Sequence, residues 1–143
     1  MKSKGFTLIE LLVVIGIIAI LAGVVIVALN PGRQFQQARD TQRWSNVNAI
    51  LNAISQNQVD NKGVFTCVVS GVSLPLPTSS RIIGANDYNI ETCISPTYIS
   101  TLPVDPSTGS ASSTGYTVIY DPNTRRVTIG ATGEITNPIS VTR

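Results

Sequence analysis

The stretch Leu11–Leu29, LLVVIGIIAILAGVVIVAL, decides the fold of this chain. Its 19 residues are drawn only from Leu, Val, Ile, Ala and Gly. As a helix the stretch would be about 28 Å long, close to the hydrocarbon thickness of a bilayer, about 30 Å. Helices of soluble proteins are rarely apolar on every face over such a length, so a buried core helix is the weaker interpretation. The stretch therefore predicts a membrane-spanning helix.

A cleaved secretory signal peptide is the more serious rival. Its apolar region normally covers about 7–15 residues and ends in a small-x-small cleavage site. Here the run is longer, and Asn30, Pro31 and Gly32 follow it. This sequence has no convincing site of that kind after the run, which favours the span.

The composition excludes several classes of function. The net charge is +2, only 13% of residues are charged and 43% are hydrophobic, which does not fit a disordered tail or a basic nucleic-acid binder. The chain has no His, which removes most metal sites and the Ser-His-Asp and Cys-His forms of catalysis. Three arginines and Trp44 do not make a platform for stacking bases. We expect no enzyme, cofactor, metal or direct nucleic-acid site.

Basic residues flank the apolar run on both sides and do not decide its orientation. Cys67 and Cys93 are the only cysteines and lie in the polar half of the chain. Such a pair suits a disulfide in an oxidising compartment, with two separate reduced thiols as the alternative. With the disulfide, the N-terminus lies in the cytoplasm and the rest of the chain outside.

Glu10 lies directly before the apolar run. A carboxylate costs about 2.5–3.5 kcal/mol at the centre of a bilayer and less near its surface, so Glu10 is either a flanking charge at the headgroups or has a cationic partner. No charged residue follows it within the run. A partner would have to come from the start of the chain or from another molecule. A cut after Gly5 would supply one, because it would leave a cationic α-amino group on Phe6.

The segment from Lys2 to Ile15, KSKGFTLIELLVVI, resembles the leader and first helix of type IV pilins and of type II secretion pseudopilins. The resemblance extends over roughly Lys2–Leu29. It implies that a prepilin peptidase cuts between Gly5 and Phe6 and that Phe6 becomes N-methylated. It also implies that Glu10 neutralises the N-terminal amine of an adjacent subunit during assembly, with the assembly machinery of the inner membrane as a further partner.

Helical periodicity resumes after Pro31 and Gly32, which predict a break or kink. Apolar residues recur at steps of three and four and define a core-facing stripe. Its members are Trp44, Val47, Ile50, Leu51 and Ile54, with Phe35 and Ala38 upstream. The residues expected to face away are Gln36, Arg39, Asp40, Arg43 and Asn46.

The predicted fold is α+β and pilin-like, a long N-terminal helix packed against a small antiparallel sheet. We divide the chain into a leader, 1–5, a transmembrane and filament-core helix, 6–29, an amphipathic helix, 30–58, and a sheet and loop region, 59–143. Residues 64–69 are β-prone, 116–120 and 126–129 read as a hairpin, and 107–115 as a surface loop.

Two further features have a chemical reading. The segment Thr97–Pro106 contains a Leu-Pro-x-Asp-Pro stretch that resembles one found in pseudopilins and some pilins, and Leu102 should point inward. Asp105, Asp121 and Glu134 are candidate calcium ligands, but calcium prefers clustered carboxylates and these are scattered in the sequence. Isolated surface carboxylates are the favoured interpretation.

Three functions remain. The first and favoured one is a structural subunit of an extracellular type IV pilus, which starts as an inner-membrane precursor and forms a homopolymer. The second is a pseudopilin of a type II secretion or DNA-uptake system. The third, a monomeric membrane-anchored module, leaves Glu10 and the Gly5–Phe6 junction unexplained. Adhesion, motility, DNA uptake and secretion are not distinguished.

Overall fold

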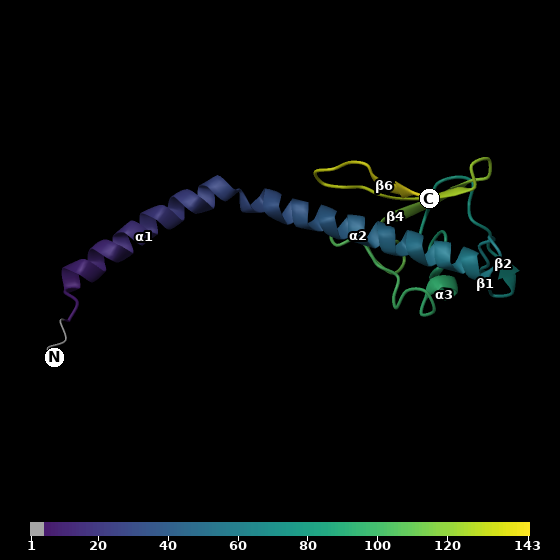
Figure 1. Cartoon of the computed structure of the whole chain (residues 1–143), viewed down its shortest axis with the longest axis horizontal. Helices are drawn as coiled ribbons and strands as arrows, with labels where there is room; N and C mark the ends of the chain where they lie inside the picture. The colour runs from purple at the N-terminus through teal and green to yellow at the C-terminus, as the bar shows by residue number, and fades with distance from the viewer. Residues whose placement is uncertain (1–4) are drawn as a thin grey trace. The chain divides into compact units, whose positions relative to one another are not determined.

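The structure is a computed structural model of the chain and describes residues 5–143 (Figure 1). It contains two compact units, the first ending at Phe35 and the second running over Gln36–Arg143. Lys2 and Lys4 of the expected leader lie outside the described residues. The helices are α1 (Leu8–Leu29), α2 (Pro31–Asp60) and α3 (Glu91–Ile94). The strands are β1 (Val68–Val69), β2 (Val72–Ser73), β3 (Arg81–Ile82), β4 (Tyr116–Asp121), β5 (Arg126–Ala131) and β6 (Ile139–Thr142). The predicted α+β, pilin-like architecture is confirmed.

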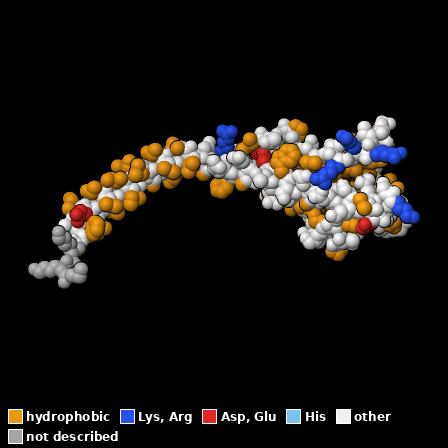
Figure 2. Space-filling view, in the orientation of Figure 1, with side chains coloured by type: hydrophobic (Ala, Val, Ile, Leu, Met, Phe, Trp, Pro, Cys, Tyr) orange, Lys and Arg blue, Asp and Glu red, His pale blue; other side chains and the backbone are white. Residues whose placement is uncertain are grey.

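The first unit is dominated by α1, and none of the residues of α1 is buried. Figure 2 shows hydrophobic side chains along the helix. By length and composition, α1 is the one helix among the described residues that could cross a membrane. The chain enters α1 through Thr7 and leaves it at Asn30, which has a left-handed backbone, φ 41°. Pro31 then opens α2, at a position where its missing N–H breaks no helical hydrogen bond.

The second unit is built on an antiparallel sheet of strand order β3-β4-β5-β6. Residues alternate along β4, β5 and β6, so one face of these strands is buried and the other is more exposed. Tyr116, Val118, Ile129 and Ile139 are fully buried on the inner face. They form one hydrophobic core with α2 residues Val47, Ile50, Leu51 and Ile54. The predicted hairpin is β4–β5, whereas β3 and β6 were not predicted.

The predicted orientation of α2 is only half right. Val47, Ile50, Leu51 and Ile54 face the core, but Trp44 is 38% exposed, and Phe35 and Ala38 are exposed as well. Asp40, Arg43 and Asn46, which were expected to face away, are buried instead. The reason is that each of them has a hydrogen-bonding partner far away in the sequence. Asn46 donates to the Tyr116 hydroxyl on β4 at 2.8 Å, and Asp40 and Arg43 bind two loops, as described below.

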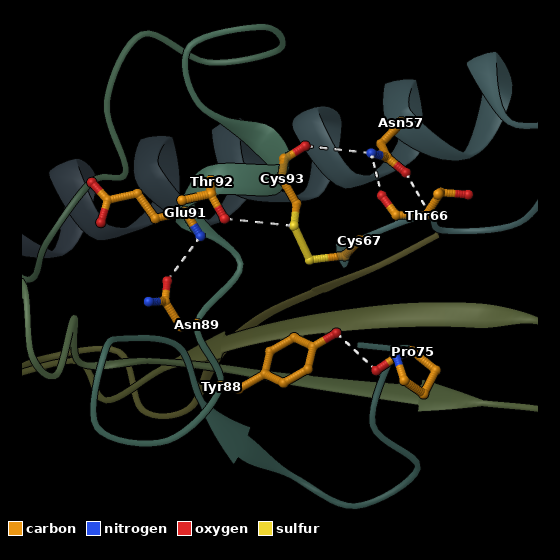
Figure 3. Close-up of a disulfide and its surroundings, with 9 residues drawn as sticks. All are labelled: Asn57, Thr66, Cys67, Pro75, Tyr88, Asn89, Glu91, Thr92 and Cys93. Carbon is orange, nitrogen blue, oxygen red and sulfur yellow. Dashed lines mark hydrogen bonds between the residues drawn. A yellow bond between two sulfur atoms is a disulfide. The ribbon is translucent and has the colours of Figure 1, made fainter. Parts of the chain in front are cut away.

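A disulfide between Cys67 and Cys93, with 5.2 Å between the Cα atoms, fixes the region after α2 (Figure 3). Beside it Asn57 of α2 accepts a hydrogen bond from the N–H of Thr66 and donates to the carbonyl oxygens of Thr66 and Cys93. The β-prone segment 64–69 forms a strand only at Val68–Val69, which pairs with β2 in a separate ribbon. Residues 64–67 run as irregular chain, held to the helix by these bonds.

Candidate assembly site

The start of α1 is closed by a capping box made by Thr7 and Glu10. Oε2 of Glu10 accepts hydrogen bonds from the backbone N–H of Thr7, at 2.8 Å, and from its hydroxyl, at 2.7 Å. The Thr7 hydroxyl in turn accepts from the N–H of Glu10 at 3.3 Å. Such reciprocal bonds satisfy N–H groups that a helix otherwise leaves without a partner. Glu10 therefore has a neutral hydrogen-bonding partner at the start of its own chain, whereas the sequence suggests a cationic partner from there or from another molecule.

The capping box uses only one oxygen of the Glu10 carboxylate. Within residues 5–143, no hydrogen bond reaches Oε1. The carboxylate therefore keeps an acceptor for a cation from outside the helix. Phe6, at 77% exposure, and Gly5 precede the cap in exposed chain outside any helix or strand. The predicted cleavage junction thus lies outside the helix. Among residues 5–143, no atom beyond Gly5 and its chain neighbours lies within 4 Å of where a Cβ on Gly5 would be.

In the second unit, Arg43 is only 2% exposed and lies at the centre of a buried ion cluster. Its Nε and Nη2 donate to the two carboxylate oxygens of Asp105 at 2.6 and 3.1 Å. Its Nη1 lies 2.8 Å from Asp40 Oδ1 and 3.0 Å from Glu134 Oε1. Nη2 also donates to the Ser107 hydroxyl at 2.7 Å. No buried side-chain nitrogen or oxygen in the described part of the chain lacks a partner, as buried charge requires.

Asp40 holds the loop between β5 and β6. Its two carboxylate oxygens accept hydrogen bonds from three successive backbone N–H groups, those of Glu134, Ile135 and Thr136, at 2.8, 2.8 and 2.9 Å. Burial alone would raise the pKa of the Asp40 carboxyl. The three N–H groups and the Arg43 guanidinium outweigh burial, and they hold this pKa well below its usual range. The side chain is therefore a carboxylate at neutral pH, and the loop is bound around it.

Asp105 anchors the second loop and belongs to the Leu-Pro-x-Asp-Pro stretch. Its Oδ1 accepts from the backbone N–H groups of Ser107 and Thr108 at 2.9 and 3.0 Å. Burial raises the pKa of the Asp105 carboxyl, but Arg43 and these donors lower it further than burial raises it. Leu102 is partly buried against the core, as predicted.

The segment 107–115, predicted to be a surface loop, is tied down at its end. Thr114 is fully buried and donates from both its N–H and its hydroxyl to the carbonyl oxygen of Ile83. Gly115 has a positive φ of 83°, and a Cβ added to it would lie 2.8 Å from Asp105 Cβ. Asp105 therefore fits only against a glycine at this position.

The three candidate calcium ligands do not come together as a set. Asp105 and Glu134 both bind Arg43, and Glu134 also receives two hydrogen bonds from Arg39 at 2.7 and 2.5 Å. Asp121 is the last residue of β4, where it accepts hydrogen bonds from the N–H of Asn123 and the hydroxyl of Thr124 in the turn that follows. Among residues 5–143, no group of three or more His, Cys, Asp or Glu is placed to hold a metal ion.

Comparison with known proteins agrees with the geometry of the first unit. Residues 1–26 match the family model described as the prokaryotic N-terminal methylation motif. The chain thus carries a prepilin-type N-terminal motif at the start of an exposed apolar helix, and its α+β second unit has a pilin-like architecture.

Two curated proteins are similar to the chain. It is 36% identical over 84 residues, 59% of its length, to the prepilin peptidase-dependent protein D of Escherichia coli (strain K12). It is 40% identical over 78 residues, 54% of its length, to the type IV wide pilus major component PilA4 of Thermus thermophilus. These alignments span 56% and 58% of the two relatives, so the chain spans little more than half of their length. No solved structure matches the chain.

Proposed function

We propose that this protein is the structural subunit of an extracellular type IV pilus. A prepilin peptidase cuts between Gly5 and Phe6, Phe6 is N-methylated, and the trimmed chain polymerises through α1. The observation that carries the proposal is the pairing of the methylation motif with a 22-residue apolar helix that has no buried residue. Similarity to a protein described as a wide-pilus major component supports the same role.

Helix α1 needs an apolar environment at every stage. Its exposed apolar side chains are unfavourable in water, because burying apolar surface contributes roughly 25 cal/mol of free energy for each Å². The inner membrane covers this surface in the precursor. In the filament the α1 helices of neighbouring subunits cover it, so leaving the membrane costs much less than entering water. Polymerisation is therefore the step that replaces lipid contacts with protein contacts.

Glu10 guides this step. Cleavage after Gly5 creates a cationic amine on Phe6, and the carboxylate of Glu10 on an adjacent subunit neutralises it. The capping box supports this role because Thr7 holds one carboxylate oxygen and leaves Oε1 for the incoming amine. The Glu10 carboxylate, which would be costly as an unpaired charge in the apolar core of the filament, is then paired with this amine.

The second unit forms the outer layer of the filament. A disulfide is stable in an oxidising compartment, which supports an N-terminus in the cytoplasm and a second unit outside. In this proposal the chain consists of a core helix, 6–29, an amphipathic helix, 30–58, and a sheet region, 59–143. The helix break predicted at Pro31 and Gly32 lies one residue earlier, at Asn30, and both of these residues belong to the first turn of α2.

Immunogold labelling with an antibody against the second unit tests the proposal. Labelled filaments that extend from the cell surface, and are lost when the gene is deleted, are the expected result. Label confined to the cell envelope would contradict a surface pilus. That outcome would favour the second candidate, a pseudopilin, which the Leu102–Pro106 stretch supports by its resemblance to such proteins.

A further inference from the structure

The two edges of the four-stranded sheet differ in how they are protected. At the β3 edge the chain itself occupies the outward groups of Ile82. The N–H of Ile82 donates to Asp87 Oδ2 at 2.8 Å, and the N–H of Tyr88 donates to the carbonyl oxygen of Ile82 at 3.0 Å. Arg81 in turn pairs with Asp87. The segment 83–88 thus closes this edge against pairing with another strand.

The β6 edge has no such protection. Val127 of β5 and Arg143 exchange two backbone hydrogen bonds, at 2.7 and 3.0 Å. Bonded pairs alternate with non-bonded pairs in an antiparallel ladder, so the N–H and C=O groups of Ser140 and Thr142 point away from β5. Within residues 5–143, no hydrogen bond reaches these four outward groups. Both side chains are exposed, and neither is charged. Open edges of this kind readily accept another strand.

This edge is complementary to itself. When two β6 strands are placed antiparallel with Val141 facing Val141 of a second copy, Ser140 lies opposite Thr142 of that copy, and Thr142 opposite its Ser140. All outward N–H and C=O groups of these residues are then paired, because residues opposite one another in such a position exchange two bonds. Arg143 falls opposite Ile139 of the second copy, so no like charges meet across the pair.

We propose that β6 pairs edge to edge with β6 of a second copy of this chain, and that the contact joins two filaments side by side. The inference rests on the proposed function. Subunits within one polar filament are related by a rotation and a rise, which do not place two β6 edges antiparallel about a two-fold axis. The two copies must therefore belong to different filaments, and the closed β3 edge offers no alternative partner for β6.

One contact of this size is weak. A four-residue edge buries far less than the roughly 1,200 Å² of a stable interface, so it would not hold two free subunits together. Two filaments lying in register present the same contact many times, and such repetition turns weak sites into strong binding. Filament pairs are therefore expected from chains that do not dimerise as single subunits.

The test removes an outward N–H group from β6 and uses a second variant to control for loss of the side chain. Ser140→Pro in the full-length chain removes one outward donor from each copy and leaves the bonds to β5 intact, a change that edge strands tolerate. Ser140→Ala is the matched control, because it removes the hydroxyl and keeps the N–H. Electron microscopy of sheared filaments then gives the filament yield and the fraction of filaments lying side by side. Thr142→Pro tests the second outward N–H in the same way.

We expect Ser140→Pro and Thr142→Pro to form filaments in wild-type yield, with a severalfold lower fraction in pairs or bundles, and Ser140→Ala to behave as wild type. Wild-type filaments that stay single, or proline variants that bundle like the wild type, would overturn the edge pairing alone. A wild-type chain that forms no filaments would overturn the proposed function and this inference with it. If one proline variant forms no filaments, the fraction of paired filaments in the other variant tests the edge pairing.

Discussion

Arg43 and Asp105 form a two-pronged ion pair across 62 residues of sequence, with Nε–Oδ2 and Nη2–Oδ1 distances of 2.6 and 3.1 Å. Both side chains are almost fully buried. Because the same guanidinium also binds Asp40, it connects the loop after Leu102 and the loop between β5 and β6 to one turn of α2. The positions of these two surface loops therefore depend on three buried charges, those of Arg43, Asp105 and Asp40.

Loss of Arg43 should destabilise the second unit strongly. Arg43→Ala leaves two buried carboxylates, Asp40 and Asp105, without their cation, and breaking a buried pair in this way typically costs about 3–5 kcal/mol. Chemical denaturation of the full-length chain in detergent, followed by tryptophan fluorescence, measures the loss. Arg33→Ala is the control, because Arg33 is exposed. Similar midpoints for both variants would contradict a stabilising cluster.

The same cluster predicts how stability depends on pH. Burial opposes ionisation of Asp40 and Asp105, but their hydrogen bonds lower both pKa values below those of the unfolded chain, about 3.9. The stabilisation is therefore complete above about pH 5 and is lost as the pH falls toward the folded-state pKa values. We expect the free energy of unfolding to drop between pH 5 and pH 2, and to drop less in Asp40→Asn. A flat profile for the wild type would contradict this.

Two glycines separate backbone strain from close packing. Gly115 and Gly71 have nearly the same positive φ, 83° and 81°. A Cβ on Gly115 would meet Asp105 Cβ at 2.8 Å, whereas no atom of the described residues, apart from Gly71 and its chain neighbours, lies within 4 Å of a Cβ on Gly71. Gly71→Ala should cost about 1–2 kcal/mol, the strain of a left-handed backbone. Gly115→Ala should cost clearly more, because Asp105 must also move. Equal shifts in melting temperature would show that the clash has no effect.

The disulfide should stabilise the region after α2. It closes a sequence separation of 26 residues, which in the loop-entropy account corresponds to about 3–4 kcal/mol. The double variant Cys67→Ser, Cys93→Ser should unfold at correspondingly lower denaturant, and it avoids leaving one free thiol. Asn57→Ala is a useful comparison, because it removes the neighbouring hydrogen bonds to Thr66 and leaves the disulfide in place. An unchanged midpoint in the double variant would contradict the expectation.

Glu10 should be needed for assembly but not for membrane insertion. Glu10→Gln keeps a side-chain oxygen for the capping box with Thr7 and removes the charge that the amine of a neighbour requires. We expect normal amounts in the membrane and a large loss of sheared filaments. Thr7→Val is the paired variant, because it removes the hydroxyl of the cap and keeps the Glu10 charge, so it should retain more filaments than Glu10→Gln. Normal filament levels in Glu10→Gln would refute the charge pairing.

The parts of the fold that are set by local pattern could be predicted from the sequence. The apolar run predicts α1, and the spacing of Val47, Ile50 and Leu51 predicts the core face of α2. The alternation of apolar and polar residues around a turn predicts the β4–β5 hairpin. The two other strands of the sheet were missed because they are short. Arg81–Ile82 has no alternation to detect, and Ile139–Thr142 follows a proline.

The buried ion cluster could not be predicted, because its members are far apart in sequence. Helical periodicity assigns charged residues to the solvent face, and this rule failed for Asp40 and Arg43, whose partners lie on loops about 60 and 95 residues away. A weak signal was present, since the Leu-Pro-x-Asp-Pro stretch singled out Asp105. The sequence makes Asp105 a candidate calcium ligand, whereas in the structure its counter-charge is the guanidinium of Arg43.

Intact-mass and N-terminal peptide analysis of sheared surface material and of membranes tests the central claim most directly. The proposed function predicts a chain that begins at N-methylated Phe6 and is abundant in the sheared fraction. An untrimmed chain beginning at Met1 and found only in membranes would contradict both the processing and the polymer.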